Sequence, residues 1–202
     1  MRATVKFMIT LRIANVLDAP ALSKIYEYYV TNTTISFEYV APTSEEFADR
    51  IADRLKKYPF VVAEDNGSPV GYAYASEYRH RSAYDWSVEL SIYVDKDERS
   101  CGIGTMLYSA LLGLLKAQNF ASAYACITVP NSPSVSFHEE MGFAFAGHLH
   151  AAGYKKGNWL DVVWYEHHLR KDEPPRDIIP FPLLPDETVR KILADAALEK
   201  TS

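Results

Sequence analysis

A short glycine-containing stretch, Arg99-Ser-Cys-Gly-Ile-Gly104, combines the residue types that bind an anion. It follows the strand-like run from Val88 to Val94 and opens an apolar helix. The start of a helix offers backbone N–H groups without partners, together with the positive end of the helix dipole. Glycines let the backbone approach a ligand closely, and Arg99 adds a side-chain cation. This spacing predicts an anion site, most often one for phosphate.

Two common phosphate-binding motifs do not fit this stretch. No Lys-Ser or Lys-Thr pair follows the glycines, as a nucleoside-triphosphate loop requires. A dinucleotide-binding turn has three spaced glycines and an acidic residue on the next strand, whereas only Gly102 and Gly104 fit here. The alternative without a ligand is that both glycines tighten a turn. The remaining pattern is Arg-x-x-Gly-x-Gly after a strand.

Glu89 is a carboxylate inside an apolar strand, and an unpaired buried charge is costly. Because the neighbouring residues alternate, Glu89 can face the side opposite the core. One interpretation is a structural salt bridge or a solvent-facing position. The other is a general base, whose pKa partial desolvation raises towards neutrality.

The elements that position these residues follow from hydrophobic spacing and capping signals. Asp18 precedes Pro20 at a helix start, Thr43-Ser-Glu-Glu46 is a capping box, and Asn66-Gly67 indicates a hairpin. The expected order is β-α-α-β-β-β-α-β-α-β-β, which predicts an α/β fold: a mixed sheet with helices on both faces. The expected strands cover 11–16, 60–64, 70–78, 88–94, 123–129, 143–150 and 159–169, and the long helix follows Gly102.

Composition narrows the class of protein. A chain of 202 residues with 48% hydrophobic residues favours one globular domain. The net charge of −5 argues against nucleic acid as a partner, and no apolar run approaches the roughly 20 residues of a membrane span. Cys101 and Cys126 come without a secretory signal, so we expect reduced thiols and a cytoplasmic protein.

The composition changes after Leu169. Residues 171–182 form a proline-rich, extended segment, and Asp186 can cap a last helix that carries Val189, Ile192, Leu193 and Ala196. We therefore predict a domain over 1–170 and a C-terminal extension over 171–202. The apolar residues of the extension favour packing on the domain or on a second subunit.

Several separated blocks give the chain a specific resemblance. With the glycine loop, the sequence resembles the GNAT superfamily of N-acetyltransferases from about Ile13 to Leu169, and within it the phosphinothricin and methionine sulfoximine N-acetyltransferases. The blocks are Asn32-Thr-Thr34 with Phe37, Tyr84-Asp-Trp-Ser-Val-Glu89, Ser91-Ile-Tyr-Val94, Asn131-Ser-Pro-Ser134, His138-Glu-Glu-Met-Gly-Phe143 and Gly153-Tyr-Lys-Lys-Gly-Asn-Trp-Leu-Asp161.

The resemblance implies the GNAT acyl-CoA N-acyltransferase fold, with the sheet splayed after Val94, and a homodimer. It implies acetyl-CoA as the donor and a small, amino-acid-like amine as the acceptor, with direct attack in a ternary complex. Glu89 matches the family's general base. His138 matches a position near the coenzyme sulfur, where it would protonate or hydrogen-bond the leaving thiolate; the alternative is a packed histidine whose ring is already satisfied.

The resemblance also implies two sets of binding residues. Asn131 would contact the pantetheine arm or a water molecule, or cap a helix. The expected acetyl-CoA contacts are Ile92, Tyr93, Val94, Arg99, Ser100, Cys101, Gly102, Ile103, Gly104, Thr105, Asn131 and Ser134. The expected acceptor contacts are Phe37, Glu38, Tyr78, Arg79, Arg81, Trp86, Tyr154 and Lys155, with Arg79 and then Arg81 as partners for a carboxylate and with Tyr154 and Lys155 closing the pocket across a dimer interface.

Other readings stay open. His148 and His150 would share one face of a strand, but no nearby cysteine or acidic pattern completes a tetrahedral site, so we expect no metal. Peptide N-terminal acetylation would use the same donor loop, and activity on tetrapeptides would favour it. A non-catalytic acyl-CoA-binding module would bind acetyl-CoA without releasing free thiol.

Overall fold

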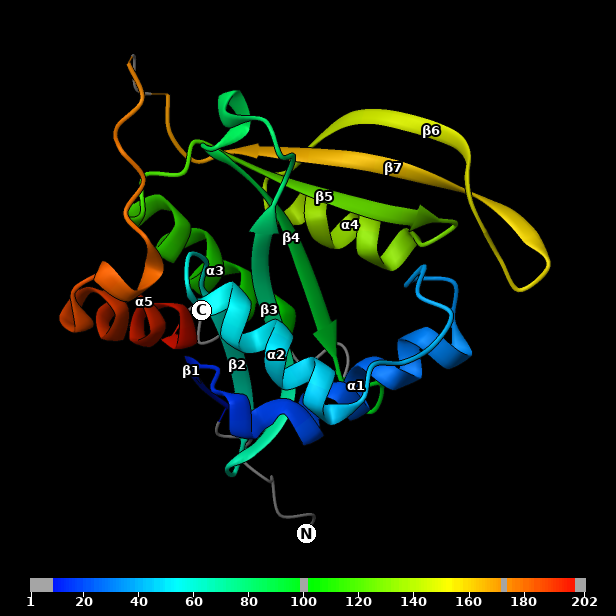
Figure 1. Cartoon of the computed structure of the whole chain (residues 1–202), viewed down its shortest axis with the longest axis horizontal. Coiled ribbons are helices and arrows are strands. Elements are labelled where there is room, and N and C mark those ends of the chain that lie inside the picture. The colour runs from blue at the N-terminus through cyan, green and yellow to red at the C-terminus, as the bar shows by residue number, and fades with distance from the viewer. Residues whose placement is uncertain (1–8, 99–101, 172–173, 199–202) are drawn as a thin grey trace, which may run out of the picture.

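The computed structural model describes residues 9–98, 102–171 and 174–198 (Figure 1). These residues contain one seven-stranded sheet in the order β1-β2-β3-β4-β5-β7-β6. The strands are β1 (Ile9–Ile13), β2 (Phe60–Asp65), β3 (Ser68–Glu77), β4 (Ser87–Val94), β5 (Ser122–Val129), β6 (Ala144–Lys155) and β7 (Asn158–His168). The α-helices are α1 (Ala19–Asn32), α2 (Ser44–Leu55), α3 (Ile103–Ala117), α4 (Ser132–Glu140) and α5 (Asp186–Leu198).

The sheet is mixed, as the sequence predicted. Only the β4–β5 pair is parallel, and the other five pairs are antiparallel. Two short signals form the local structure that they predict. Thr43 caps α2 and Glu46 completes the capping box, while Asn66 and Gly67 both take positive φ in the β2–β3 turn.

Helices cover both faces of the sheet, which confirms the predicted layers. Alternation along β2 sends Val61 into one hydrophobic cluster and Val62 into the other. Val62 packs with residues of α1 and α2, including Leu22 and Phe47. Val61 belongs to the larger cluster, which contains the buried side of α3 and residues of α5. Burial of these two apolar layers is the main stabilising contribution to the fold.

The sheet splits between β4 and β5. Their parallel pairing covers only Ser87–Glu89 and Ser122–Tyr124, and it ends where Glu89 lies opposite Tyr124. The split therefore begins after Glu89, whereas the family resemblance implied a split after Val94. Antiparallel pairing with β3 holds β4 as far as Val94, so the strand stays regular although its other edge has lost its partner. The part of β4 beyond Glu89 therefore has no strand partner on the β5 side.

The β6–β7 hairpin is longer than expected. Strand β6 continues to Lys155, past the predicted end at His150, and the chain reverses at Lys156-Gly157. The register shifts between Leu149 and Gly153, so this bulge interrupts the alternation on which a sequence-based strand boundary depends.

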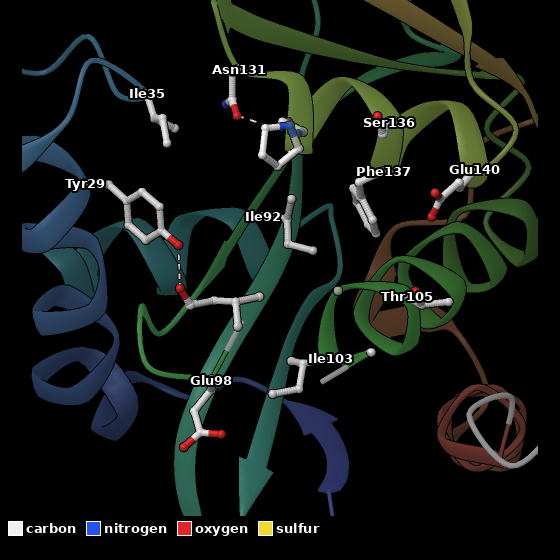
Figure 2. A pocket seen from close by; sticks show the side chains of 15 residues that line it. Tyr29, Ile35, Ile92, Glu98, Ile103, Thr105, Asn131, Ser136, Phe137 and Glu140 are labelled. Atoms are coloured by element: carbon white, nitrogen blue, oxygen red, sulfur yellow. Dashed lines mark hydrogen bonds between the residues drawn. The ribbon is translucent and has the colours of Figure 1, made fainter. Parts of the chain in front are cut away.

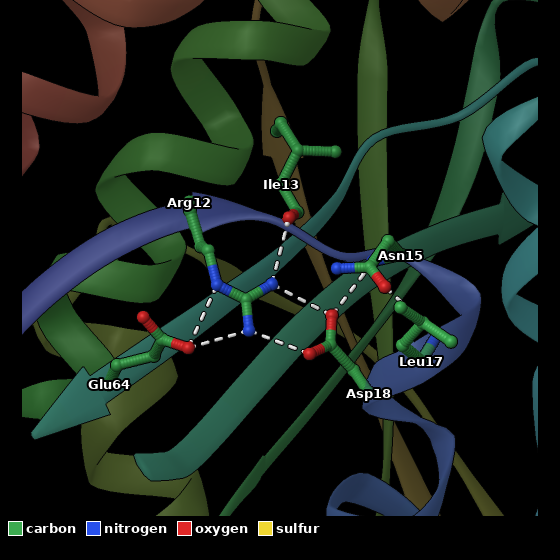
Figure 3. A network of polar contacts seen from close by, with 6 residues as sticks. All are labelled: Arg12, Ile13, Asn15, Leu17, Asp18 and Glu64. Atoms are coloured by element: carbon green, nitrogen blue, oxygen red, sulfur yellow. Dashed lines mark hydrogen bonds and ion pairs between the residues drawn. The ribbon is translucent and has the colours of Figure 1, made fainter. Parts of the chain in front are cut away.

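The first strand ends three residues before its predicted end at Val16. It ends at Ile13 because Asn15 caps a 3-10 turn over Val16–Asp18. The Arg12 guanidinium joins this turn to β2: Nη2 lies 2.6 Å from both Asp18 Oδ1 and Glu64 Oε1 (Figure 3). A fork that pairs with two carboxylates fixes the entry of the chain into α1.

The described part of the extension packs on the domain. Helix α5 contacts α3 and β1, and the two helices lie side by side in Figure 1. Gln118 Nε2 donates to the carbonyls of Lys57 and Ile179, both at 2.8 Å, and so joins the extension to the end of α3. Among the described residues, no helix is both long and apolar enough to cross a lipid bilayer.

Candidate active site

A cavity of about 580 Å³ opens at the N-terminus of α3, and we call it the loop cavity (Figure 2). Residues of α1, β4, α3 and α4 surround it, so it occupies the split in the sheet. Its lining residues are Tyr29, Ile35, Ile92, Val94, Glu98, Gly102, Ile103, Gly104, Thr105, Asn131, Pro133, Ser134, Ser136, Phe137 and Glu140.

The start of α3 has the backbone geometry that the predicted anion site requires. Gly102 caps the helix with a φ of 75°, a left-handed conformation that favours glycine. The first helical hydrogen bond runs from the N–H of Met106 to the carbonyl of Gly102, so the amides of Ile103, Gly104 and Thr105 precede the regular ladder. A Cβ at Gly104 would lie 3.2 Å from the Phe137 ring, so a larger residue there would need the ring to shift slightly. The predicted residues Arg99, Ser100 and Cys101 lie outside the described residues.

Strand β4 brings its predicted backbone groups to this cavity. Ile92 and Val94 both line it, on the part of β4 that no longer pairs with β5. The Val94 carbonyl already accepts a hydrogen bond of 2.5 Å from the Tyr29 hydroxyl. An incoming extended ligand would therefore find one of the two expected backbone positions partly engaged by α1.

A second cavity, of about 490 Å³, surrounds Glu89, and we call it the Glu89 cavity. It shares Ile35, Ile92, Asn131 and Ser134 with the loop cavity, so the two are adjoining parts of one cleft. The remaining lining residues are Tyr26, Ser36, Phe37, Glu38, Glu89, Leu90, Ser91, Tyr93, Tyr108, Ala125, Cys126, Ile127, Thr128, His138 and Val162.

The surroundings of Glu89 make its carboxyl group a weaker acid than usual. Its carboxylate makes no hydrogen bond or ion pair within the described chain, which does not support the salt-bridge interpretation. Burial raises the pKa of Glu89 above its ordinary value, and the positive charge of Arg79 opposes this shift. A carboxylate that is held partly away from water and faces a cavity can accept a proton from a ligand.

His138 is buried, and both of its ring nitrogens have partners. Nδ1 lies 2.7 Å from the carbonyl of Ser134, so it carries a proton and donates. Nε2 lies 3.0 Å from the Tyr108 hydroxyl and, in the neutral ring, accepts from it. Burial lowers the pKa of His138, which favours that neutral ring, while the bond to Ser134 opposes the shift. This geometry matches the interpretation of a packed, satisfied histidine.

Asn131 and Cys126 complete the polar wall. The Asn131 side chain caps α4, accepting from the N–H of Ser134 at 3.4 Å, and it also lines both cavities. The expected capping role is therefore present, and the position of Asn131 on both cavities is compatible with the expected contact to a ligand. Cys126 is exposed overall, but desolvation of its thiol by the surrounding atoms, assisted by the nearby charge of Glu89, raises the pKa of that thiol to about 12. A thiol that stays protonated at neutral pH is a poor nucleophile.

The segment 35–38 forms the outer wall of the Glu89 cavity, and Lys155 holds it in place. Phe37 and Glu38 line the cavity as predicted. Lys155 does not: its buried ammonium donates to the carbonyls of Val30 at 2.7 Å and Ser36 at 2.6 Å. Glu38 is already paired, accepting from Arg50 at 2.8 Å and from the Tyr26 hydroxyl at 3.0 Å.

The other expected acceptor residues lie outside the cavity lining. Tyr78 stacks on Tyr124 with ring centroids 4.3 Å apart, and the exposed Arg79 guanidinium lies 5.1 Å from the Tyr78 ring centre. Trp86 instead donates its indole N–H to the Arg176 carbonyl of the extension, at 2.7 Å. Arg81 is exposed, and so is Tyr154, which packs edge-on against Trp159.

The sequence did not predict that several other residues line the two cavities. Tyr108 and Tyr26 lie at apolar positions of helices, where a tyrosine gives no signal beyond packing. Tyr29 belongs to the same apolar stripe of α1. Thr128 and Cys126 lie on β5, and the alternation there indicates only that they share a face.

Comparison with known proteins assigns the class that this cleft suggests. A family model described as "Acetyltransferase (GNAT) domain" matches residues 11–164. A phosphinothricin N-acetyltransferase of Streptomyces viridochromogenes is 38% identical over 172 residues, covering 85% of this chain and 94% of that protein. An L-methionine sulfoximine/L-methionine sulfone acetyltransferase of Pseudomonas aeruginosa is 33% identical over 165 residues, covering 79% and 94%.

A solved structure shows the same fold. The GNAT superfamily phosphinothricin acetyltransferase from Sinorhizobium meliloti, in complex with AcCoA, superposes with a TM-score of 0.80 at 34% identity, covering 86% of this chain and 97% of that one. The fold is that of an N-acetyltransferase. The chain belongs to the GNAT acetyltransferase family, as its sequence blocks predicted.

Proposed function

We propose that this N-acetyltransferase transfers the acetyl group of acetyl-CoA to the amine of a small amino-acid analogue of the phosphinothricin or methionine sulfoximine type. The observation that carries the proposal is the Glu89 cavity. It places a partly buried carboxylate with a raised pKa beside a cleft that continues to the glycine-capped start of α3. The substrates named for the two relatives support this acceptor class.

In this proposal the donor occupies the loop cavity. The amides of Ile103, Gly104 and Thr105 bind the pyrophosphate at the positive end of α3, with Arg99, Ser100 and Cys101 beside them. The pantetheine arm follows β4 past Tyr93, and Asn131 and Ser134 contact its end. This route brings the thioester to the residues that both cavities share.

The acceptor amine enters the Glu89 cavity as an ammonium ion and must lose a proton before it can attack. Glu89 takes that proton, directly or through a water molecule. The nitrogen attacks the thioester carbonyl, the C–N bond forms and the C–S bond breaks. A second proton leaves the nitrogen as the amide forms and neutralises the coenzyme thiolate. Holding both substrates in one cleft supplies much of the rate.

The geometry supports a positioning role for His138. Its Nδ1 proton is engaged by Ser134 and its Nε2 accepts from Tyr108, so the ring holds the Tyr108 hydroxyl at the cavity wall. Cys126 stays a thiol and forms no acyl intermediate, which agrees with direct attack in a ternary complex.

Further proposals concern the surroundings of the site. Arg79, whose charge acts on Glu89, pairs with the acceptor carboxylate at the cavity mouth, with Arg81 as the second candidate. The exposed rings of Phe145, Tyr154 and Trp159 on β6 and β7 support a homodimer, which light scattering during gel filtration would test. We propose a catalytic domain over 1–170 with an extension over 171–202, a cytoplasmic location, and no nucleic-acid or membrane partner.

A thiol-release assay with acetyl-CoA tests the function. We expect turnover with methionine sulfoximine, methionine sulfone or phosphinothricin. Activity on tetrapeptides but on none of these three would instead support peptide acetylation. Binding of acetyl-CoA without thiol release across a broad amine panel would contradict the proposed catalysis.

A further inference from the structure

The β6–β7 hairpin brings together three side chains that the proposed reaction does not use. His148 and His150 lie on β6, and Asp161 lies across from them on β7. His148 Nε2 is 2.9 Å and His150 Nδ1 is 3.0 Å from the same atom, Asp161 Oδ2. One possible ligand atom from each residue lies within 4.8 Å of the other two. Two imidazoles and a carboxylate thus converge on one point.

The backbone directs this convergence. The register of β6 and β7 shifts between Leu149 and Gly153, and Ala151 in this bulge has a φ of 48°. In the register that pairs His148 with Val163 and Leu149 with Val162, Asp161 follows next on β7 and lies on the face that His148 and His150 share. The N–H of Ala151 donates to the other oxygen, Asp161 Oδ1, at 2.8 Å, so the carboxylate is fixed with Oδ2 towards the rings.

From this arrangement we propose that His148, His150 and Asp161 bind a divalent transition-metal ion, with Zn²⁺ as a representative. Imidazole nitrogens favour this class, whereas Ca²⁺ and Mg²⁺ prefer oxygen ligands alone. Bonds of about 2.1 Å to a tetrahedral ion set ligand atoms about 3.4 Å apart. Oδ2 therefore needs to move by about half an ångström from each ring nitrogen, and the two ring nitrogens lie within 4.8 Å of each other. Metal binding displaces the protons that these two nitrogens now donate.

The site is separate from the proposed catalytic cavity. Neighbouring residues on a strand face opposite sides of the sheet, and Val162, next to Asp161, lines the Glu89 cavity. His148 and Asp161 are about one-third exposed, so water can fill the remaining coordination position. The ion would join β6 to β7 across the bulge, and acetyl transfer would not require it.

Titration calorimetry with ZnCl₂ on the full, tag-free chain after chelator treatment tests the proposal. We expect saturable binding of one ion per chain. His148→Ala, His150→Ala and Asp161→Asn should each weaken it by about tenfold or more, and Ca²⁺ should give no heat. His80→Ala is the matched control, because His80 forms an exposed pair with Glu77 at 2.8 Å that lies apart from this cluster. It should leave the affinity unchanged.

A second readout guards against loss of structure in the variants. Asp161→Asn keeps an oxygen for the Ala151 amide, and circular dichroism checks the fold of each variant. Zn²⁺ should raise the melting temperature of the wild-type chain and of His80→Ala but not of the three cluster variants. No saturable binding, or equal affinity in the wild type and all three variants, would overturn the proposal.

Discussion

The ring of Phe37 lies directly against the Cα of Gly153. A Cβ added at Gly153 would come within 2.7 Å of both Cδ2 and Cζ of that ring, closer than real side chains pack. Phe37 lines the Glu89 cavity, so the hairpin glycine sets the position of a residue at the proposed acceptor site. This contact explains why the family-like block begins with a glycine at position 153.

We predict that Gly153→Ala raises the KM for the acceptor amine. The new methyl group must displace the Phe37 ring, and overpacking of this kind costs about 1–3 kcal/mol, which corresponds to roughly 5- to 160-fold in KM if it falls on acceptor binding. The affinity for acetyl-CoA should not change. Steady-state kinetics and acetyl-CoA titration measure the two effects separately.

Gly147→Ala is the matched control, because a Cβ at Gly147 meets nothing within 4 Å on the same strand. It should behave as the wild type. Phe37→Ala in the Gly153→Ala background should remove the crowding. An unchanged acceptor KM in Gly153→Ala would show that Phe37 does not set acceptor binding.

Lys155 should also affect acceptor binding, because it holds the segment 35–38 that lines the Glu89 cavity. Replacing it with Met removes the donor to the carbonyls of Val30 and Ser36 and leaves buried acceptors unpaired. We expect a loss of about 1–3 kcal/mol in the free energy of unfolding, together with a higher acceptor KM. Urea denaturation measures the first quantity and kinetics the second.

Lys156→Met provides the comparison. Lys156 also donates to a backbone carbonyl, that of Thr31 at 2.7 Å, but its contact is exposed and water can replace it. We expect a change of less than about 0.5 kcal/mol in the free energy of unfolding. Equal losses in both lysine variants would mean that burial at Lys155 carries no special contribution.

Glu89→Gln should lower kcat by about 10²- to 10⁴-fold, the usual contribution of a general base. The amide has nearly the same shape, so the acetyl-CoA affinity should change little. Glu77→Gln on β3 serves as the control, because Glu77 is exposed and pairs with His80. Turnover close to that of the wild type in Glu89→Gln would remove Glu89 from the role of base.

The pH profile gives an independent check on Glu89. Only the carboxylate form accepts a proton, so kcat/KM falls as the pH drops through the pKa of Glu89. Because burial raises that pKa, the midpoint of the acidic limb should lie above the ordinary value of 4.5. The charge of Arg79 lowers the pKa, so Arg79→Ala should move the midpoint higher, and less so at high salt. Arg190→Ala on α5 should not move it.

Local signals allowed much of this fold to be predicted. The capping box at Thr43, the Asn66-Gly67 turn and the glycine that caps α3 each depend on a few neighbouring residues, and each forms as expected. The order of helices and strands along the chain followed from the succession of such elements, and the family followed from separated sequence blocks.

What could not be predicted depends on register and on distant partners. Trp86 faces the extension 90 residues later, and Lys155 reaches carbonyls 125 and 119 residues earlier. Asp161 meets His148 and His150 only because β6 and β7 pair in the register that places Val163 opposite His148. No spacing within one element carries that information, since it arises from tertiary packing.

The contact between Gly113 on α3 and Ile192 on α5 gives a test of the extension. A Cβ at Gly113 would lie 2.9 Å from the Ile192 Cγ2 methyl group. Gly113→Ala therefore combines a gain of about 1 kcal/mol in helix propensity with a packing cost of about 1–3 kcal/mol. We expect net destabilisation in the full chain. In the Ile192→Ala background the clash is gone, so the same substitution should stabilise the protein. Denaturation of the four variants of this cycle measures the change of sign. An equal effect of Gly113→Ala in both backgrounds would mean that α5 does not pack on α3 in solution.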